Sequence, residues 1–224
     1  MAKKILVCSD RDGTINVDND YYLGKSPNWK SQIEFLPGVI RGIKLLNKIP
    51  NLEFFIITNQ SGVAISYDKK DSEFANLTEE RMHEVNHEII TQLAGNGASV
   101  RSYFACPFVD SAYAKSALVK GRTINSKYLH DNHPNRKPAI GMIEKAAKSI
   151  SSKLSDCDIW MIGNRFSDVQ TGINANGRSI LIERNSRPED ITQAFAAAEI
   201  FPDRIFLAFN FYRAAKKIAE TYQT

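Results

Sequence analysis

Short apolar runs alternate with amphipathic stretches along most of this chain. Five of the runs have the length and the β-branched or aromatic content of buried strands: 5–9, 52–57, 100–106, 158–162 and 179–182. Between them, apolar residues recur at the spacing of helices, as in 39–50, 77–93 and 139–150. Strands separated by helices predict an α/β fold with a parallel, doubly wound, Rossmann-like sheet.

Two helical stretches are predicted to close the chain, at 189–198 and at about 203–221, and an apolar stripe in the second is expected to dock on the sheet. The segments 16–34 and 107–135 lack any period. We interpret the first as a flap over the carboxyl end of the first strand and the second as a long basic loop. We therefore expect residues 1–224 to form a single domain, with loop insertions but no large cap domain.

Composition narrows the class of protein without identifying it. The chain has 224 residues, 43% of them hydrophobic, which is enough to bury a sizeable core. A net charge of +4 suits an anionic small substrate but is too mild to demand a nucleic acid. Three widely spaced cysteines indicate a reduced protein, and no apolar run is long enough for a signal peptide or a membrane span. We thus expect a cytoplasmic protein with no membrane partner and no evident obligate protein partner.

Polar side chains gather where the predicted strands end. They form four groups: Asp10 with Asp12, Thr58 with Asn59, Arg136 with Lys137, and Asn164 with Asp168. Because the carboxyl ends of parallel strands share one edge of a sheet, these groups are expected to converge on one crevice. Such carboxylates, hydroxyls, amides and cations suit phosphoryl transfer, which needs a nucleophile, Mg2+ and positive charge around the phosphoryl group. The pattern Asp-x-Asp-Gly alone fits a capped polar turn equally well.

The ordered set of motifs resembles the haloacid dehalogenase (HAD) superfamily of aspartyl-phosphate phosphatases. One branch of it contains D-glycero-D-manno-heptose 1,7-bisphosphate phosphatase and the histidinol phosphatase domain. Three segments look closest to that branch: Asp-Arg-Asp-Gly-Thr-Ile-Asn at 10–16, Thr-Asn-Gln-Ser-Gly at 58–62 and Arg-Lys-Pro at 136–138. The resemblance implies a HAD-like fold and a Mg2+-dependent phosphatase acting on a small phosphorylated metabolite, with a sugar bisphosphate as the nearest model.

The resemblance also implies a role for each motif residue. Asp10 would be the nucleophile that becomes phosphorylated, and Asp12 the acid and base that serves the leaving oxygen and the water. Substrate contacts would come from Thr58, Asn59, Arg136, Lys137 and Arg165. Mg2+ would be held by Asp10, the backbone carbonyl of Asp12, Asn164 and Asp168.

One position departs from the pattern of the branch. Where Gly-Asp-Lys-x-x-Asp is usual, this chain has Gly-Asn-Arg-Phe-Ser-Asp at 163–168. The neutral Asn164 stands where a metal carboxylate is expected, so Mg2+ should bind less tightly unless Asp168 compensates. Arg165 keeps the positive charge of the usual lysine and adds a fork suited to phosphate. A catalytically impaired protein that only binds a phosphate ligand is therefore an alternative to the enzyme.

A second departure concerns the zinc loop of the branch. Cys106 remains, but the places of the other three ligands hold Phe108, His133 and Asn135, so structural zinc is not expected. Two other enzymatic alternatives stay open, a histidinol-phosphate phosphatase and a nucleic-acid 3′-phosphatase. The basic residues of 107–135 favour the latter slightly, whereas the modest net charge speaks against a nucleic-acid partner. The sequence does not identify the substrate.

Overall fold

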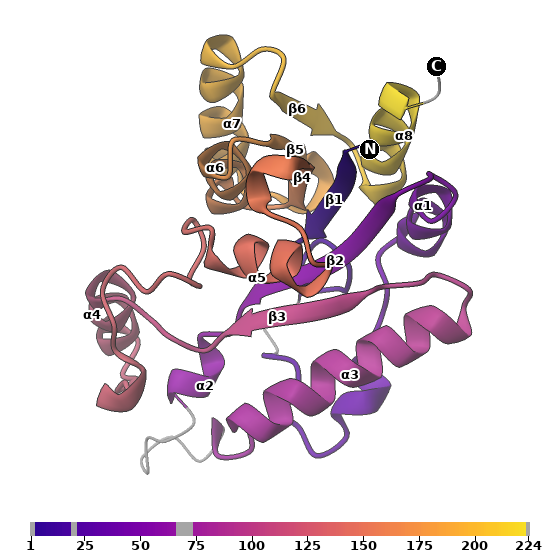
Figure 1. Ribbon diagram of the computed structural model, residues 1–224. Coiled ribbons are helices and arrows are strands. Elements are labelled where there is room, and N and C mark those ends of the chain that lie inside the picture. Colours follow the sequence, from indigo (N-terminus) through magenta and orange to yellow (C-terminus); the bar gives the residue numbers. More distant parts are fainter. Residues whose placement is uncertain (1–2, 19–21, 66–73, 223–224) are drawn as a thin grey trace.

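Within residues 3–18, 22–65 and 74–222, which the computed structural model describes, the chain folds around a six-stranded, all-parallel sheet. The strands are β1 (Lys4–Ser9), β2 (Leu52–Asn59), β3 (Ser102–Cys106), β4 (Cys157–Gly163), β5 (Arg178–Ile182) and β6 (Ile205–Ala208) (Figure 1). Their order across the sheet is β3-β2-β1-β4-β5-β6. From β1 the chain adds β2 and β3 on one side of the sheet, and it then returns to add β4, β5 and β6 on the other side of β1. A crevice is therefore expected at the carboxyl ends of β1 and β4.

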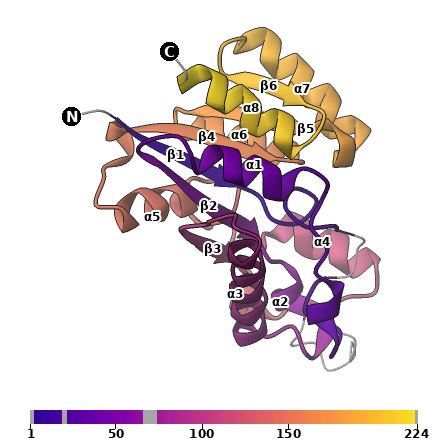
Figure 2. The same cartoon turned by 90° about the vertical axis from the view of Figure 1, so that its right-hand side faces the viewer.

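Helices cover both faces of the sheet (Figures 1 and 2). One face carries α1 (Val39–Leu46), α3 (Glu79–Gly95) and α8 (Phe211–Tyr222), and the other carries α5 (Gly141–Ser149), α6 (Phe166–Asn174) and α7 (Pro188–Ile200). Two further helices, α2 (Gly62–Ile65) and α4 (Ser111–Val119), lie beyond the carboxyl ends of β2 and β3. The predicted doubly wound α/β sheet is confirmed.

Alternate residues of the central strands point into two separate cores. Val7 and Phe54 belong to the core under α1, α3 and α8, whereas their neighbours Leu6 and Phe55 belong to the core under α5. All four side chains are 2% exposed or less. Successive residues of a strand face opposite sides, and both sides are covered here. This is why the strands read as continuous apolar runs in the sequence.

The C-terminal segment differs from its prediction. Instead of one helix over about 203–221, the structure has β6 and then α8. Ile205, Leu207 and Phe209 follow one another at intervals of two residues, which is the spacing of a strand and not of a helix. All four residues of β6 pair with β5. The prediction of a single helix was therefore wrong. A strand of four residues is too short for the alternation of its side chains to stand out in the sequence.

The segment 107–135 is not a uniformly irregular loop. It contains α4 and a 3₁₀ turn at Ser126–Tyr128. The carboxylate of Asp110 caps α4 by accepting a hydrogen bond from the backbone N–H of Tyr113 at 2.7 Å. Ala117 is the one buried residue of α4, so the helix has no apolar stripe that the sequence could reveal.

The predicted flap at 16–34 includes a 3₁₀ turn at Trp29–Gln32, and its residues 19–21 lie outside the described part of the chain. Trp29 is 4% exposed and packs into the core under α1, α3 and α8. Tyr22, by contrast, borders the cavity described below. None of the helices in the described residues has both the length and the apolar character needed to cross a membrane.

Candidate active site

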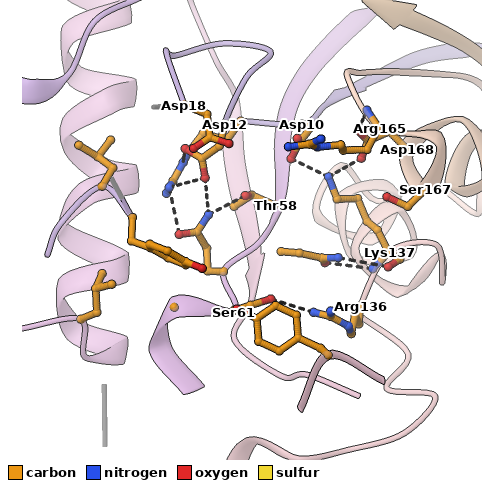
Figure 3. Close-up of a pocket in the computed structure, with 18 of the residues that line it drawn as sticks. Asp10, Asp12, Asp18, Thr58, Ser61, Arg136, Lys137, Arg165, Ser167 and Asp168 are labelled. Carbon is orange, nitrogen blue, oxygen red and sulfur yellow. Dashed lines mark hydrogen bonds and ion pairs between the residues drawn. The ribbon is translucent and has the colours of Figure 1, made fainter. Parts of the chain in front are cut away.

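A cavity of about 440 Å3 opens at the carboxyl edge of the sheet (Figure 3). Asp10 enters it directly after β1, Thr58 from the end of β2, and Asp168 from the first turn of α6, which follows β4. Lys137 enters from the segment that precedes α5. The predicted convergence of polar groups from separate strand ends is therefore present at the reversal point of the strand order.

Two carboxylates in this cavity share one ammonium group. The Nζ atom of Lys137 donates hydrogen bonds to Oδ1 of Asp10 and to Oδ1 of Asp168, each at 2.6 Å (Figure 3). The second oxygen of Asp168 accepts a hydrogen bond from the backbone N–H of Arg165 at 3.0 Å. Asp168 is thus fixed at both oxygens, whereas Oδ2 of Asp10 accepts no hydrogen bond within the described residues.

This group carries more negative than positive charge. The side chains of Asp10, Lys137 and Asp168 are 11%, 3% and 1% exposed, so water screens them little. Burial raises the pKa of Asp10, the charge of Lys137 lowers it, and the charge of Asp168 raises it. Together these effects raise the pKa of Asp10 to about 7. Burial lowers the pKa of Lys137, but the two carboxylates outweigh burial and raise it. The cavity therefore suits one further positive charge beside Asp10.

Asp12 lines the same cavity but is held by a different set of groups. Its carboxylate accepts hydrogen bonds from Nε and Nη2 of Arg11 at 3.0 and 2.7 Å, from Gln60 at 2.8 Å and from Asn16 at 3.0 Å. Arg11 is 1% exposed and also donates from Nη1 to Asn86 of α3 at 3.1 Å. Burial raises the pKa of Asp12, but Arg11 and the hydrogen bonds outweigh burial and hold the pKa below its usual range.

Asn59 positions Lys137 through its backbone. Its Nδ2 donates to the carbonyl oxygen of Lys137 at 3.1 Å, and its Oδ1 accepts from the Lys137 N–H at 3.0 Å. The hydroxyl of the neighbouring Thr58 accepts a hydrogen bond from Gln60 at 2.9 Å. Both side chains line the cavity, but the Asn59 amide already uses both of its ends to hold the lysine segment.

One wall of the cavity is aromatic. Tyr113 of α4 and Tyr22 of the predicted flap both line it. Burial is the main reason that the pKa of Tyr113 is raised. The guanidinium of Arg136 lies 5.5 Å from the Tyr113 ring centre and pairs with Asp110 at 2.9 Å. The segment 107–135 therefore supplies part of the cavity wall.

The side of the cavity around α6 is cationic. Arg165 immediately precedes α6, Ser167 lies in its first turn, and Arg187 immediately precedes α7; all three line the cavity. Figure 3 places Arg165 and Ser167 beside Asp168, on the side where Lys137 reaches Asp10. The sequence motif pointed to Arg165, but nothing in the sequence distinguished Ser167 or Arg187.

The side chain of Asn164 is held by contacts within the protein, and its role as a metal ligand stays a prediction. It is 2% exposed and is not among the residues that line the cavity. Its Nδ2 donates to the carbonyl oxygen of Asn185 at 2.9 Å, and its Oδ1 accepts from the Thr14 hydroxyl at 3.3 Å. The amide also packs against Gly13, where an added Cβ would stand 2.4 Å from Nδ2. Both ends of the amide are thus engaged within the protein.

The donor set fits a magnesium ion in part. Mg2+ prefers carboxylate and carbonyl oxygens and usually keeps several waters. Asp10, with one free carboxylate oxygen, and Asp168 lie in one cavity whose buried charge is unbalanced. The backbone carbonyl of Asp12 belongs to the same loop. The side chain of Asn164 does not join this set in the conformation described here.

The cysteine and histidine side chains of the 106–133 region make a smaller cluster. Cys106 Sγ lies 3.7 Å from Nδ1 of His133, whose ring stacks on Phe108 with a centroid distance of 4.0 Å. Within the described residues, no group of three or more metal-ligating His, Cys, Asp or Glu side chains is found. The absence of structural zinc stays a prediction.

Comparison with known proteins relates the chain to one family. Residues 134–206 match a family model described as HAD-hydrolase-like. The chain is 30% identical over 166 residues to a D-glycero-beta-D-manno-heptose-1,7-bisphosphate 7-phosphatase of Mesorhizobium japonicum, which covers 74% of this chain and 63% of that protein. A protein of the same name from Haemophilus influenzae is 29% identical over 179 residues, covering 80% of this chain and 81% of the relative. The chain thus spans less than two thirds of the length of the first relative.

Solved structures show the same fold. A D,D-heptose 1,7-bisphosphate phosphatase from B. bronchiseptica, complexed with magnesium and phosphate, superposes with a TM-score of 0.68 at 20% identity, over 97% of this chain and 99% of that one. A HAD-like phosphatase from Mesorhizobium loti superposes with a TM-score of 0.62 at 25% identity, over 89% and 88% of the two chains. The sheet and its helical layers are therefore those of HAD-like proteins.

Proposed function

We propose that this chain, which belongs to the HAD-like hydrolases, is a Mg2+-dependent phosphatase that hydrolyses a small phosphorylated metabolite. The reaction would pass through an acyl phosphate of Asp10, the mixed anhydride formed by its carboxylate and the phosphoryl group. The observation that carries the proposal is the contact of Lys137 with both Asp10 and Asp168 at 2.6 Å within a cavity at the carboxyl edge of the sheet. A buried lysine beside a nucleophilic carboxylate can neutralise the phosphoryl group as it approaches.

In the first step, a carboxylate oxygen of Asp10 attacks phosphorus. A bond forms between this oxygen and phosphorus while the bond from phosphorus to the leaving oxygen breaks. Lys137 holds Oδ1 of Asp10 in place, which leaves Oδ2 as the attacking atom. The Thr58 hydroxyl would donate a hydrogen bond to a phosphoryl oxygen, and Arg136 would border the leaving group.

Asp12 would move the protons of both steps. It gives a proton to the leaving oxygen, and it then takes a proton from the water that attacks the phosphorylated Asp10 and releases inorganic phosphate. In the resting protein its low pKa favours the carboxylate, which is the form needed for the second step. The negative phosphoryl group raises this pKa on arrival, which favours the protonated form needed for the first step.

Mg2+, when bound by Asp10, Asp168 and the Asp12 carbonyl, would supply positive charge next to the transferring phosphoryl oxygens. The remaining work falls to the protein. Lys137 orients Asp10, Asn59 fixes the segment that carries Lys137, and Arg11 with Gln60 orients Asp12.

The substrate we propose is a sugar bisphosphate such as D-glycero-D-manno-heptose 1,7-bisphosphate. Relatives that carry this activity in their names are 24–30% identical to this chain. A cavity of about 440 Å3 is large enough for a phosphorylated sugar. Tyr22 and Tyr113 offer ring faces on which the carbon–hydrogen face of a sugar can pack.

The test is phosphate release from this bisphosphate by purified protein with Mg2+. Asp10→Asn should lower kcat by at least about a thousandfold, because an amide cannot form the phosphorylated intermediate. The control is Asp203→Asn, since Asp203 is an exposed aspartate that is not among the residues lining the cavity. Mass spectrometry of protein quenched during turnover should locate a phosphate on Asp10. Equal turnover by the wild-type and Asp10→Asn proteins would refute the proposal.

A second candidate is a protein that binds a phosphate ligand without turning it over. The observation that favours it is Asn164, a neutral residue whose amide is engaged by Thr14 and Asn185. The two candidates predict different behaviour of Asn164→Asp. A large gain in Mg2+ affinity and rate indicates an impaired site, whereas wild-type turnover that hardly changes in this variant indicates that Asp168 already compensates.

A further inference from the structure

Tyr22 has a backbone conformation that is unusual for an aromatic residue. Its φ angle is 46°, in the left-handed region that bulky residues rarely adopt because of steric strain. A residue keeps such a conformation only where the surrounding structure holds it, and residues of this kind gather at ligand-binding sites. Tyr22 also lines the cavity. The contacts that hold Tyr22 therefore decide the shape of this part of the cavity.

The Tyr22 ring packs against residues from two other segments of the chain. Its centre lies 4.9 Å from that of the buried Phe74, in an edge-to-face arrangement. A Cβ atom at Gly62 would stand 2.8 Å from Cδ1 of Tyr22, so the ring occupies space that a side chain at position 62 would need. Gly62 itself lines the cavity, four residues after Thr58. The ring is thus seated next to the segment that brings Thr58 into the site.

Arg122 is the charged residue that contacts Tyr22. Its Nη1 donates a hydrogen bond to the Tyr22 hydroxyl at 3.1 Å. The guanidinium carbon lies 5.4 Å from the Tyr22 ring centre and 4.9 Å from that of Phe74, within the distance at which a cation is attracted to a ring face. The backbone N–H of Arg122 donates to the carbonyl oxygen of Ala117 at 3.0 Å, which fixes Arg122 just after α4. Arg122 is not among the residues that line the cavity.

The helix that precedes Arg122 supplies the other tyrosine of the aromatic wall. Tyr113 belongs to α4 and lines the cavity, as Tyr22 does. The two tyrosines pack against one cluster of three buried side chains, those of Ile65, Phe74 and Leu77. Arg122 therefore joins the segment 107–135, which carries Tyr113, to the flap residue Tyr22.

We propose that Arg122 is a positioning residue that determines substrate specificity from outside the cavity. It holds Tyr22 in the left-handed conformation, so that the two tyrosine rings together form a wall for the carbon–hydrogen face of a sugar. The inference rests on the proposed function and goes beyond it, because Arg122 touches neither the substrate nor the reacting atoms. Without Arg122, its contacts no longer offset the strain at Tyr22, and the ring leaves the wall.

The experiment compares a large leaving group with a small one. The kcat/KM values for D-glycero-D-manno-heptose 1,7-bisphosphate and for acetyl phosphate are measured with Mg2+, and their ratio is taken, because acetate is too small to pack on two rings. Arg122→Gln should lower this ratio about tenfold, since the hydrogen bond to Tyr22 and the contact of the cation with the ring are both lost. Arg122→Lys should restore part of the ratio, because the charge remains and the planar group is lost.

Two further variants decide whether Arg122 acts through Tyr22. Tyr22→Leu should lower the ratio, and Arg122→Gln added to Tyr22→Leu should lower it no further. Lys120→Gln changes an exposed lysine of the same segment and should keep the wild-type ratio. If Arg122 only stabilised the fold, Arg122→Gln would lower kcat/KM for both substrates alike.

Binding separates a failure of this inference from a failure of the proposed function. Calorimetry with the Asp10→Asn protein measures its affinity for the bisphosphate and for inorganic phosphate, and Arg122→Gln should weaken the binding of the bisphosphate alone, about tenfold. Absence of turnover by the wild-type protein contradicts the proposed function, whereas this measurement still tests Arg122.

Three results overturn the role of Arg122. The first is a ratio and an affinity that do not change in Arg122→Gln. The second is a double variant in which the effects of Arg122→Gln and Tyr22→Leu multiply, because the two residues then act independently. The third is an Asp10→Asn protein that binds the bisphosphate no more tightly than inorganic phosphate.

Discussion

Replacing Lys137 with methionine tests the charge arrangement of the cavity most directly. Methionine keeps much of the length of the side chain but removes the ammonium group that Asp10 and Asp168 share at 2.6 Å. Breaking a buried ion pair by removing one partner typically costs about 3–5 kcal/mol, because a charge is left buried without compensation. Two carboxylates are left here, so we expect the upper part of this range.

The loss should depend on pH, with a sign that follows from the carboxylates. Asp10 already has a pKa of about 7 in the folded protein, against 3.8 for its ordinary value. Without Lys137 its pKa rises further, so the folded protein binds protons that the unfolded chain releases. The folded state of the variant is therefore stabilised as the pH falls through the pKa of Asp10 in the folded protein, and it is destabilised as the pH rises through that pKa.

The assay is urea denaturation in the presence of EDTA, at about pH 8 and again at about pH 5.5. The control is Lys148→Met, which changes an exposed lysine of α5. Lys137→Met should lose about 4–5 kcal/mol of unfolding free energy relative to this control at the higher pH and clearly less at the lower pH. A loss equal to that of Lys148→Met, or one that grows as pH falls, would show that the three groups do not interact as described.

Two further substitutions test contacts elsewhere. Asn164→Asp should lower the melting temperature in EDTA, because a donor to the Asn185 carbonyl becomes an oxygen that faces it, and Mg2+ should reverse the loss; a melting temperature that does not respond to Mg2+ would show that residue 164 stays outside the metal site. Asp158→Asn should lower the free energy of unfolding by about 1–3 kcal/mol in urea denaturation, because Asp158 accepts two hydrogen bonds from Arg178 and one from Tyr222 of α8. If Tyr222→Phe lowers that free energy by the same amount in the wild-type protein and in Asp158→Asn, the two residues are not coupled and this reasoning is contradicted.

The central strands and the approach of Asp10 to Lys137 could be predicted from the sequence, for physical reasons. The central strands are buried on both faces, so their apolar runs are long and continuous. Asp10 and Lys137 belong to short motifs at strand and helix ends, and the parallel topology alone brings such ends together. β6 and α4 were missed because one is four residues long and the other has a single buried residue.

Side-chain commitments were harder to predict. An asparagine amide can form hydrogen bonds with a phosphate or with backbone groups. Nothing in the sequence around Asn59 indicates that its amide pairs with the backbone of Lys137. Successive residues of an extended chain face opposite sides, so Arg11 would be expected to point away from Asp10 and Asp12. In the structure its long side chain folds back onto the Asp12 carboxylate, because that carboxylate and Gln60 offer acceptors to a guanidinium that is 1% exposed.

The link between Arg11 and Asn86 has a consequence for how this protein can diverge. Arg11 is sealed from water, and its Nη1 depends on an acceptor supplied by α3, 75 positions later in the chain. An aliphatic residue at position 86 would strand that nitrogen, whereas a neutral residue at position 11 would release the helix from the requirement. Among descendants of this sequence, positions 11 and 86 should therefore change as a pair, and a lone replacement of Asn86 should be rare.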